Sequence, residues 1–141
     1  MHAIISLKPK YARLVADGAK TVEIRRRRVH MEVGTTLWIY ATLPDARIIG
    51  HARVVEVTFA DAETIWERFH TNMGVDQAEF QAYVAGRSKV SAVSLDRLVP
   101  VRRATTLDGL RKRVRGFHPP QFYARVGQDS NLVTMLQGAI R

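Results

Sequence analysis

The sequence predicts an α+β fold: a small mixed β-barrel of five to six strands surrounded by short helices. Segments typical of strands recur along the 141 residues, and amphipathic segments typical of helices separate them. This length fits one domain, and no internal repeat or low-complexity linker divides the chain. We therefore expect residues 1–141 to fold as a single domain, with strands and helices packed around a small barrel.

The strand segments are marked by β-branched and aromatic residues and by alternation of apolar and polar positions. They are expected at residues 3–7, 21–27, 36–42, 48–59, 90–99 and 121–126. Gly50 lies inside the longest of these, where a glycine indicates a bulge or a close backbone approach. Pro100 is expected to limit the fifth strand, because proline cannot donate to a strand ladder.

The helical segments are marked by apolar residues at helical spacing and by start and stop signals. They are expected at residues 8–17, 61–69, 76–85, 106–113 and 131–137. Pro9 suits the first turn of the first helix, and Gly18 caps its end. Asp61 is expected to cap the second helix and Gly86 to end the third.

Charge and cysteine content restrict the class of partner and the compartment. The formal net charge is +9, and such an excess favours polyanionic partners such as nucleic acids. A solvated basic surface, or a GC-rich genome that favours arginine codons, would explain the same composition. There is no cysteine, which excludes disulfides and thiolate chemistry and fits a reducing cytoplasm. We find neither a secretory signal nor an apolar run near the ~20 residues of a membrane span, so we expect a cytoplasmic protein.

The densest polar segment runs from Gly18 to Arg28. Glu23 and Arg25 share one face of the predicted strand, and Lys20 lies at the turn before it. A carboxylate between two cations can orient both of them, and such a cluster can bind a phosphate or a base edge, or activate a water. The alternative is a solvated, salt-bridged strand that contributes little to stability.

Several motifs resemble the ASCH domains, which belong to the PUA-like barrels, and their order and spacing cover nearly the whole chain. They are Ser6-Leu7-Lys8-Pro9-Lys10-Tyr11-Ala12, Gly18-x-Lys20-x-x-Glu23-x-Arg25, Trp38-Ile39-Tyr40-Ala41-Thr42, Ile49-Gly50, the pair Tyr83 and Gly86, and Pro119-Pro120-Gln121. The resemblance implies a PUA-like barrel with a cleft lined by the second motif. It also implies RNA binding, since the family is linked to RNA metabolism and transcription coactivation.

The resemblance leaves two functions open. The first is an RNA- or nucleotide-binding protein that uses a basic cleft. The second is a hydrolase in the same cleft, either a ribonuclease or an amidohydrolase on a modified nucleoside such as acetylated cytidine. Some short family members resemble such amidohydrolases and use a lysine, a threonine and a glutamate; Lys20 matches the lysine, but Glu23 stands where they have threonine. A regulatory module that binds an acidic protein is a third possibility.

The predicted site residues follow from these motifs. The ligand-binding set is Ser6, Lys8, Lys20, Glu23, Arg25, Tyr40 and Gln121. If the protein is an enzyme, we expect Lys20 and Glu23 to do acid–base work with Tyr40. Tyr40 could equally be a wall residue of the barrel, whereas Gln121 is held rigidly by the two prolines before it.

Two further arginine groups are expected to form a nucleic-acid surface, although ordinary exposed arginines would look the same. They are Arg26, Arg27 and Arg28, and Arg102, Arg103, Arg111 and Arg115, the second group extending the cleft. The five histidines have no metal-ligand spacing, so we predict no metal and no other cofactor. The predicted partner is RNA or a nucleotide, with no membrane.

Overall fold

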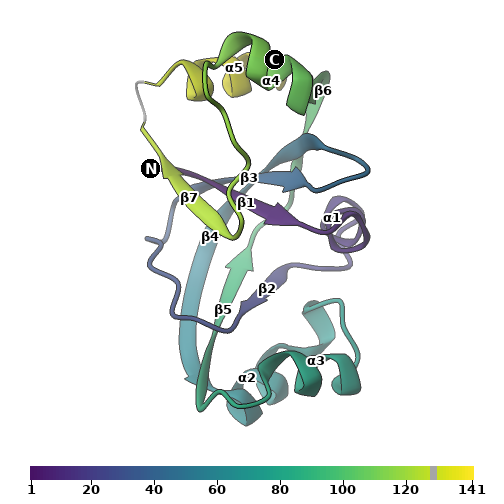
Figure 1. The fold of residues 1–141 in the computed structure, drawn as a ribbon. Helices are drawn as coiled ribbons and strands as arrows, with labels where there is room; N and C mark the ends of the chain where they lie inside the picture. The colour runs from purple at the N-terminus through teal and green to yellow at the C-terminus, as the bar shows by residue number, and fades with distance from the viewer. Residues whose placement is uncertain (128–129) are drawn as a thin grey trace.

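The fold was analysed in a computed structural model, which describes residues 1–127 and 130–141. It is a mixed sheet with helices gathered at its two ends (Figure 1). The strands are β1 (His2–Leu7), β2 (Val22–Arg25), β3 (Thr36–Ala41), β4 (Arg47–Asp61), β5 (Lys89–Leu95), β6 (Val99–Thr106) and β7 (Tyr123–Val126). The helices are α1 (Pro9–Ala16), α2 (Ala62–Phe69), the short 3₁₀ helix η1 (His70–Asn72), α3 (Gln77–Val84), α4 (Leu107–Arg113) and α5 (Asn131–Ala139).

The strand order is β2-β5-β4-β3-β1-β7, with β6 paired to β4. Among the described strands, β1 and β3 run parallel, and the other pairs are antiparallel. The long strand β4 joins the two halves of the sheet: its first half pairs with β3 and β6, and its second half pairs with β5. The path has two ends, β2 and β7, so the described strands form a curved sheet rather than a hydrogen-bonded closed barrel.

Helices cover the sheet at both ends, which leaves three hydrophobic clusters. In Figure 1, α2 and α3 lie at one end of the molecule, α4 and α5 lie at the other, and α1 lies at the side. One cluster fills the middle of the sheet under α1, a second lies under α2 and α3, and a third lies under α4 and α5. The central strands are buried on both faces, and this is why β1 and β3 are almost continuously apolar.

The predicted elements are found with shifts of a few residues at their ends, and one strand was missed. The predicted strand at residues 90–99 ends earlier, at Leu95, and β6 follows through Pro100. Strand β6 is an exposed edge strand rich in arginine, so its sequence lacks the alternation of apolar and polar residues that marked the other strands. Within residues 1–127 and 130–141 the sheet therefore has seven strands instead of five or six.

The prediction for Gly50 is confirmed in both of its forms. The register between β4 and β6 shifts next to it, and so does the register between β4 and β3. A Cβ atom at this position would lie 2.3 Å from the Val99 carbonyl oxygen. Glycine is needed here because the backbone of β6 crosses too close for any side chain.

The predicted helix caps are also found. Asp61 accepts a hydrogen bond from the Thr64 N–H at the start of α2, and Gly18 and Gly86 adopt left-handed conformations just beyond α1 and α3. Among the described residues, no helix is both long and apolar enough to cross a membrane.

Candidate functional site

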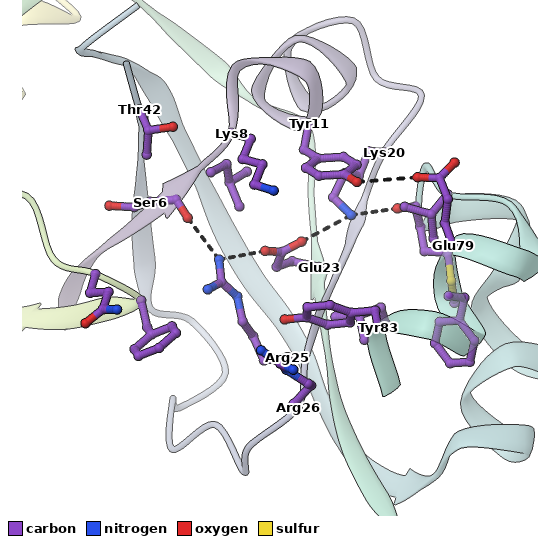
Figure 2. A pocket seen from close by; sticks show the side chains of 17 residues that line it. Ser6, Lys8, Tyr11, Lys20, Glu23, Arg25, Arg26, Thr42, Glu79 and Tyr83 are labelled. Atoms are coloured by element: carbon purple, nitrogen blue, oxygen red, sulfur yellow. Dashed lines mark hydrogen bonds and ion pairs between the residues drawn. The ribbon is translucent and has the colours of Figure 1, made fainter. Parts of the chain in front are cut away.

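A cavity of about 480 Å³ opens between the sheet and the helices α1 and α3 (Figure 2). Its walls come from β1 and β2, from the segment that enters α1, from the loop before α3, and from the segment before β7. These elements are far apart in the sequence. The cavity lies where the outer strand β2 faces β1 without pairing to it.

Lys20 forms the floor of this site. Its side chain is only 3% exposed, because the turn after α1 folds the chain inward: the Lys20 N–H donates to the Leu14 carbonyl at 3.0 Å. The ammonium donates to the carbonyl oxygens of Val22 at 2.9 Å and Met73 at 2.6 Å, and lies 3.2 Å from Oε1 of Glu23. Three acceptors match the three N–H bonds of an ammonium, so Lys20 is fully engaged within the protein.

Gly74 fits against the stem of this lysine. Its φ is +71°, and a Cβ atom there would lie 3.2 Å from Cβ of Lys20 and 3.1 Å from Leu14. The loop before α3 therefore needs a glycine both for its conformation and for its contact with the buried lysine.

Glu23 connects Lys20 to Arg25. Its second oxygen, Oε2, lies 2.7 Å from Nη2 of Arg25, and the two side chains are 11% and 13% exposed. The same Nη2 donates to the Ser6 carbonyl at 3.0 Å. Arg25 thus reaches from β2 across to β1, and Glu23 fixes the orientation of its guanidinium plane.

Part of the Arg25 guanidinium is left for a ligand. Both N–H bonds of Nη2 are taken by Glu23 and Ser6. Nε is buried without an acceptor, and within residues 1–127 and 130–141 Nη1 also has no hydrogen-bond partner. Nη1 therefore keeps two unpaired N–H donors beside the cavity, whereas the Nε–H is enclosed by the protein.

Ser6 holds the opposite rim of the cavity. Its hydroxyl donates to the Pro120 carbonyl, and its N–H donates to the Phe122 carbonyl at 3.0 Å. These bonds bring Gln121 and the half-exposed ring of Phe122 to the mouth of the cavity.

The helical rim is formed by Tyr11 of α1 and by Glu79 and Tyr83 of α3. The Tyr11 hydroxyl lies 3.4 Å from the Glu79 carboxylate, while Tyr83 extends across the cavity toward Glu23 and Arg25 (Figure 2). Burial raises the pKa of Tyr83, and the nearby Arg25 charge opposes this only in part. The Tyr83 hydroxyl is therefore protonated at neutral pH and can donate a hydrogen bond.

The structure brings most of the predicted ligand-binding residues together. The predicted ligand-binding residues that line the cavity are Ser6, Lys8, Lys20, Glu23, Arg25 and Gln121. Arg26, expected only on a flanking surface, also lines it.

Tyr40 is not in the cleft, so this part of the prediction is wrong. Its side chain is 3% exposed and belongs to the cluster under α4 and α5, with Trp38, Leu110 and Phe117. The central strands are covered on both faces, and Tyr40 points to the face away from the cavity. Burial raises the pKa of Tyr40, opposed by the charge of Arg111.

The two arginine groups lie in different places. Arg27 and Arg28 continue from Arg26 and lie over aromatic rings, 5.9 Å from the centroid of Phe122 and 5.1 Å from that of Phe59. The second group, on β6, on α4 and just after α4, does not extend the cleft: none of its four arginines lines the cavity, and α4 lies at the end of the molecule opposite α3 (Figure 1).

The residues that sequence reasoning missed come mostly from the helical rim. They are Tyr11, Thr42, Glu79, Tyr83 and Phe122. Tyr11 and Thr42 lie within the motifs that carry the family resemblance, and Tyr83 is itself one of the matching residues, so their positions carried a signal. Glu79 and Phe122 carried none. Within the described ranges, no three His, Asp or Glu side chains are grouped closely enough to hold a metal ion.

Comparisons with known proteins agree with this architecture. The model of the ASCH domain matches residues 5–96, which include the Lys20, Glu23 and Arg25 segment. A protein of Zymomonas mobilis, an ASCH domain-containing ribonuclease, is 34% identical over 120 residues, covering 85% of this chain and 80% of its own. The crystal structure of ASCH from Zymomonas mobilis superposes with a TM-score of 0.87 at 32% identity, over 95% of this chain and 94% of the other.

A more distant structure shares the fold alone. Human THYN1, solved in complex with DNA containing 5-methylcytosine, superposes with a TM-score of 0.58 at 13% identity over 99% of this chain and 98% of the other. These matches confirm the predicted fold class and the resemblance found in the sequence. The chain belongs to the ASCH domain family.

Proposed function

We propose that this protein binds RNA through the cleft, with Arg25 as the main ligand-contacting side chain. The observation that carries the proposal is a guanidinium held in place by Glu23 and Ser6, with the N–H bonds of Nη1 left unpaired by the described residues beside a cavity of about 480 Å³. Phosphate oxygens and base carbonyls are the acceptors that such a donor set recognises. The net charge of +9 and the ribonuclease name of the Zymomonas relative support the same class of ligand.

Lys20 and Glu23 act as positioning residues in this proposal. The three N–H bonds of Lys20 are engaged, so its role is to hold the Glu23 carboxylate. Glu23 in turn holds Arg25. Lys8 and Arg26 at the rim supply positive charge that attracts the phosphate backbone.

Fluorescence anisotropy with a short, labelled single-stranded RNA tests the proposal. We expect R25A to weaken binding at least tenfold and R25K to recover only part of the loss, because lysine keeps the charge but not the fork. The matched control is R53A, since Arg53 is an exposed arginine of β4 outside the cavity. Affinity should fall steeply between about 50 and 200 mM salt. Salt-insensitive binding, or equal losses for R25A and R53A, would contradict the proposal.

A second candidate is RNA hydrolysis in the same cleft, which the name of the relative favours. The cleft offers a carboxylate that can accept a proton, a guanidinium that can neutralise a phosphate, and a protonated tyrosine that can donate. Incubating the protein with labelled RNA and with acylated nucleosides, with and without divalent cations, tests turnover. RNA cleavage that is lost in E23Q would establish a ribonuclease, and intact RNA together with tight binding would establish a binding protein.

We further propose that residues 1–141 form one domain that works in a reducing cytoplasm. The structural match to the Zymomonas protein extends over 95% of the chain, well beyond the segment matched by the family model. The absence of cysteine fits that compartment.

A further inference from the structure

The Arg26 guanidinium lies over the Tyr83 ring at the mouth of the cavity. Tyr83 is 39% exposed and lines the cavity, and the Arg26 guanidinium carbon lies 5.1 Å from the ring centroid. Figure 2 shows the ring extending from α3 toward Arg25 and Glu23, with Arg26 beside it. One face of the ring is therefore backed by a cation, while the rest of the ring faces the cavity.

Such a ring is suited to a flat ligand. Stacking of a base on an aromatic side chain contributes about 1–3 kcal/mol, and a guanidinium over the same ring holds it in place. The outer end of the Arg25 guanidinium, with the unpaired Nη1, lies ahead of the ring, where the edge of a stacked base would come. Donors at that edge favour a base that presents a carbonyl oxygen over adenine, which has no carbonyl oxygen and whose acceptors N1 and N7 each lie beside its amino donor.

Resting on the function proposed above, we propose that Tyr83, backed by Arg26, stacks one unpaired base of the RNA, and that Arg25 selects a base bearing a carbonyl oxygen. The substrate class is thus RNA with an unpaired cytosine, uracil or guanine at the bound position. Tyr83 contacts the base and Arg25 determines its identity in this arrangement, and Arg26 is a positioning residue that acts through the Tyr83 ring.

The chain offers a matched control for Arg26. Arg28 lies two residues further on, and its guanidinium is also 5.1 Å from an aromatic ring, that of Phe59. Both arginines are exposed, but only Arg26 lines the cavity. If the arginines acted through charge alone, R26A and R28A would weaken binding equally and each would lower the salt dependence by about one phosphate contact.

The experiment compares the affinities of these variants for labelled RNA by anisotropy, with folding checked by thermal unfolding. We expect Y83L to weaken RNA binding about tenfold and Y83F to bind like the wild type. We expect R26A to lower the RNA affinity about threefold more than R28A does. That excess should vanish in a Y83L background. We also expect an RNA whose only unpaired base is adenine to bind about tenfold more weakly than one with uracil there.

The outcomes separate the two proposals. If Y83L binds like the wild type while R25A does not, the stacking inference is overturned and the RNA-binding proposal stands. If Y83F lowers the RNA affinity as much as Y83L does, the hydroxyl rather than the ring contacts the RNA, which also overturns stacking. Equal losses for R26A and R28A overturn the role of Arg26. If neither R25A nor Y83L changes RNA binding, the cleft is not the RNA site and both proposals fail.

Discussion

Replacing Lys20 by methionine tests whether the buried ammonium organises the site. Methionine keeps an unbranched side chain of similar length, so the packing against Gly74 can be maintained. It removes the donor to the carbonyls of Val22 and Met73 and leaves Glu23 paired with Arg25 alone.

The expected cost follows from burial. Breaking a buried ion pair by removing one partner costs about 3–5 kcal/mol, because the remaining charge is left without compensation. Here Arg25 still pairs with Glu23 at 2.7 Å, so we take the lower end and expect a loss of about 3 kcal/mol in the free energy of unfolding. For a chain of this length such a loss lowers the Tm by roughly 10 °C.

Urea and thermal unfolding followed by circular dichroism measure this loss. The matched control is K10M, because the Lys10 side chain is 65% exposed and lies 3.6 Å from the Glu79 carboxylate. That change should cost at most about 0.5 kcal/mol. The double variant K20M/E23Q should lose less than the sum of the single variants by about 1–3 kcal/mol. A K20M protein within about 1 kcal/mol of the wild type, or strict additivity with E23Q, would refute the reasoning.

Three further substitutions test other parts of the structure. G74A should cost about 1–2 kcal/mol in urea unfolding, because alanine at φ +71° is strained and its Cβ would press on Lys20; a neutral effect would contradict the close contact. G50A should cost about 3 kcal/mol or more, since its Cβ would lie 2.3 Å from the Val99 carbonyl oxygen, and a fully stable G50A protein would show that β6 can move away. H2N should make the folding stability fall less as the pH is lowered. Burial lowers the pKa of His2 below its ordinary 6.5, so the unfolded state binds the proton more readily and stability falls as the pH drops below about 6.5. Asparagine can accept the Trp38 indole N–H, as Nδ1 of His2 does at 3.1 Å, without titrating; an unchanged pH profile of the Tm would exclude His2 as a cause.

The cleft could be predicted where its residues are close in sequence. Lys20, Glu23 and Arg25 lie within one turn and one strand, so their spacing placed them together before any fold was known. Tyr83 comes from α3, some sixty positions along the chain, and nothing local to it shows that it faces Arg25. Non-local contacts of this kind depend on how the helices pack, which the spacing of residues does not contain.

The error at Tyr40 has a related cause. A strand buried on one face alternates in polarity, and the alternation tells which side chains face the core. In β3 five of six residues are buried, so the alternation is lost and the sequence does not tell which face Tyr40 occupies. Strand β6 was missed for the opposite reason. Backbone hydrogen bonds pair it to β4, but its side chains are largely exposed, so its sequence shows no apolar face.

The hydrogen bond from Arg25 to Ser6 bridges the open seam of the curved sheet, where β2 faces β1. Strands β2 and β1 do not pair. The Arg25 side chain connects them by donating a hydrogen bond to the Ser6 carbonyl. The segment after β2 forms two hydrogen bonds with β7. The His30 N–H donates to the Tyr123 hydroxyl, and Arg125 donates to the His30 carbonyl, each at 3.2 Å. A ligand that binds Nη1 and draws the Arg25 side chain toward itself would weaken the bond from Nη2 to the Ser6 carbonyl. We therefore expect ligand binding and the opening of this seam to be thermodynamically linked. Binding in the cleft should then change the stability of the contacts at both edges of the sheet.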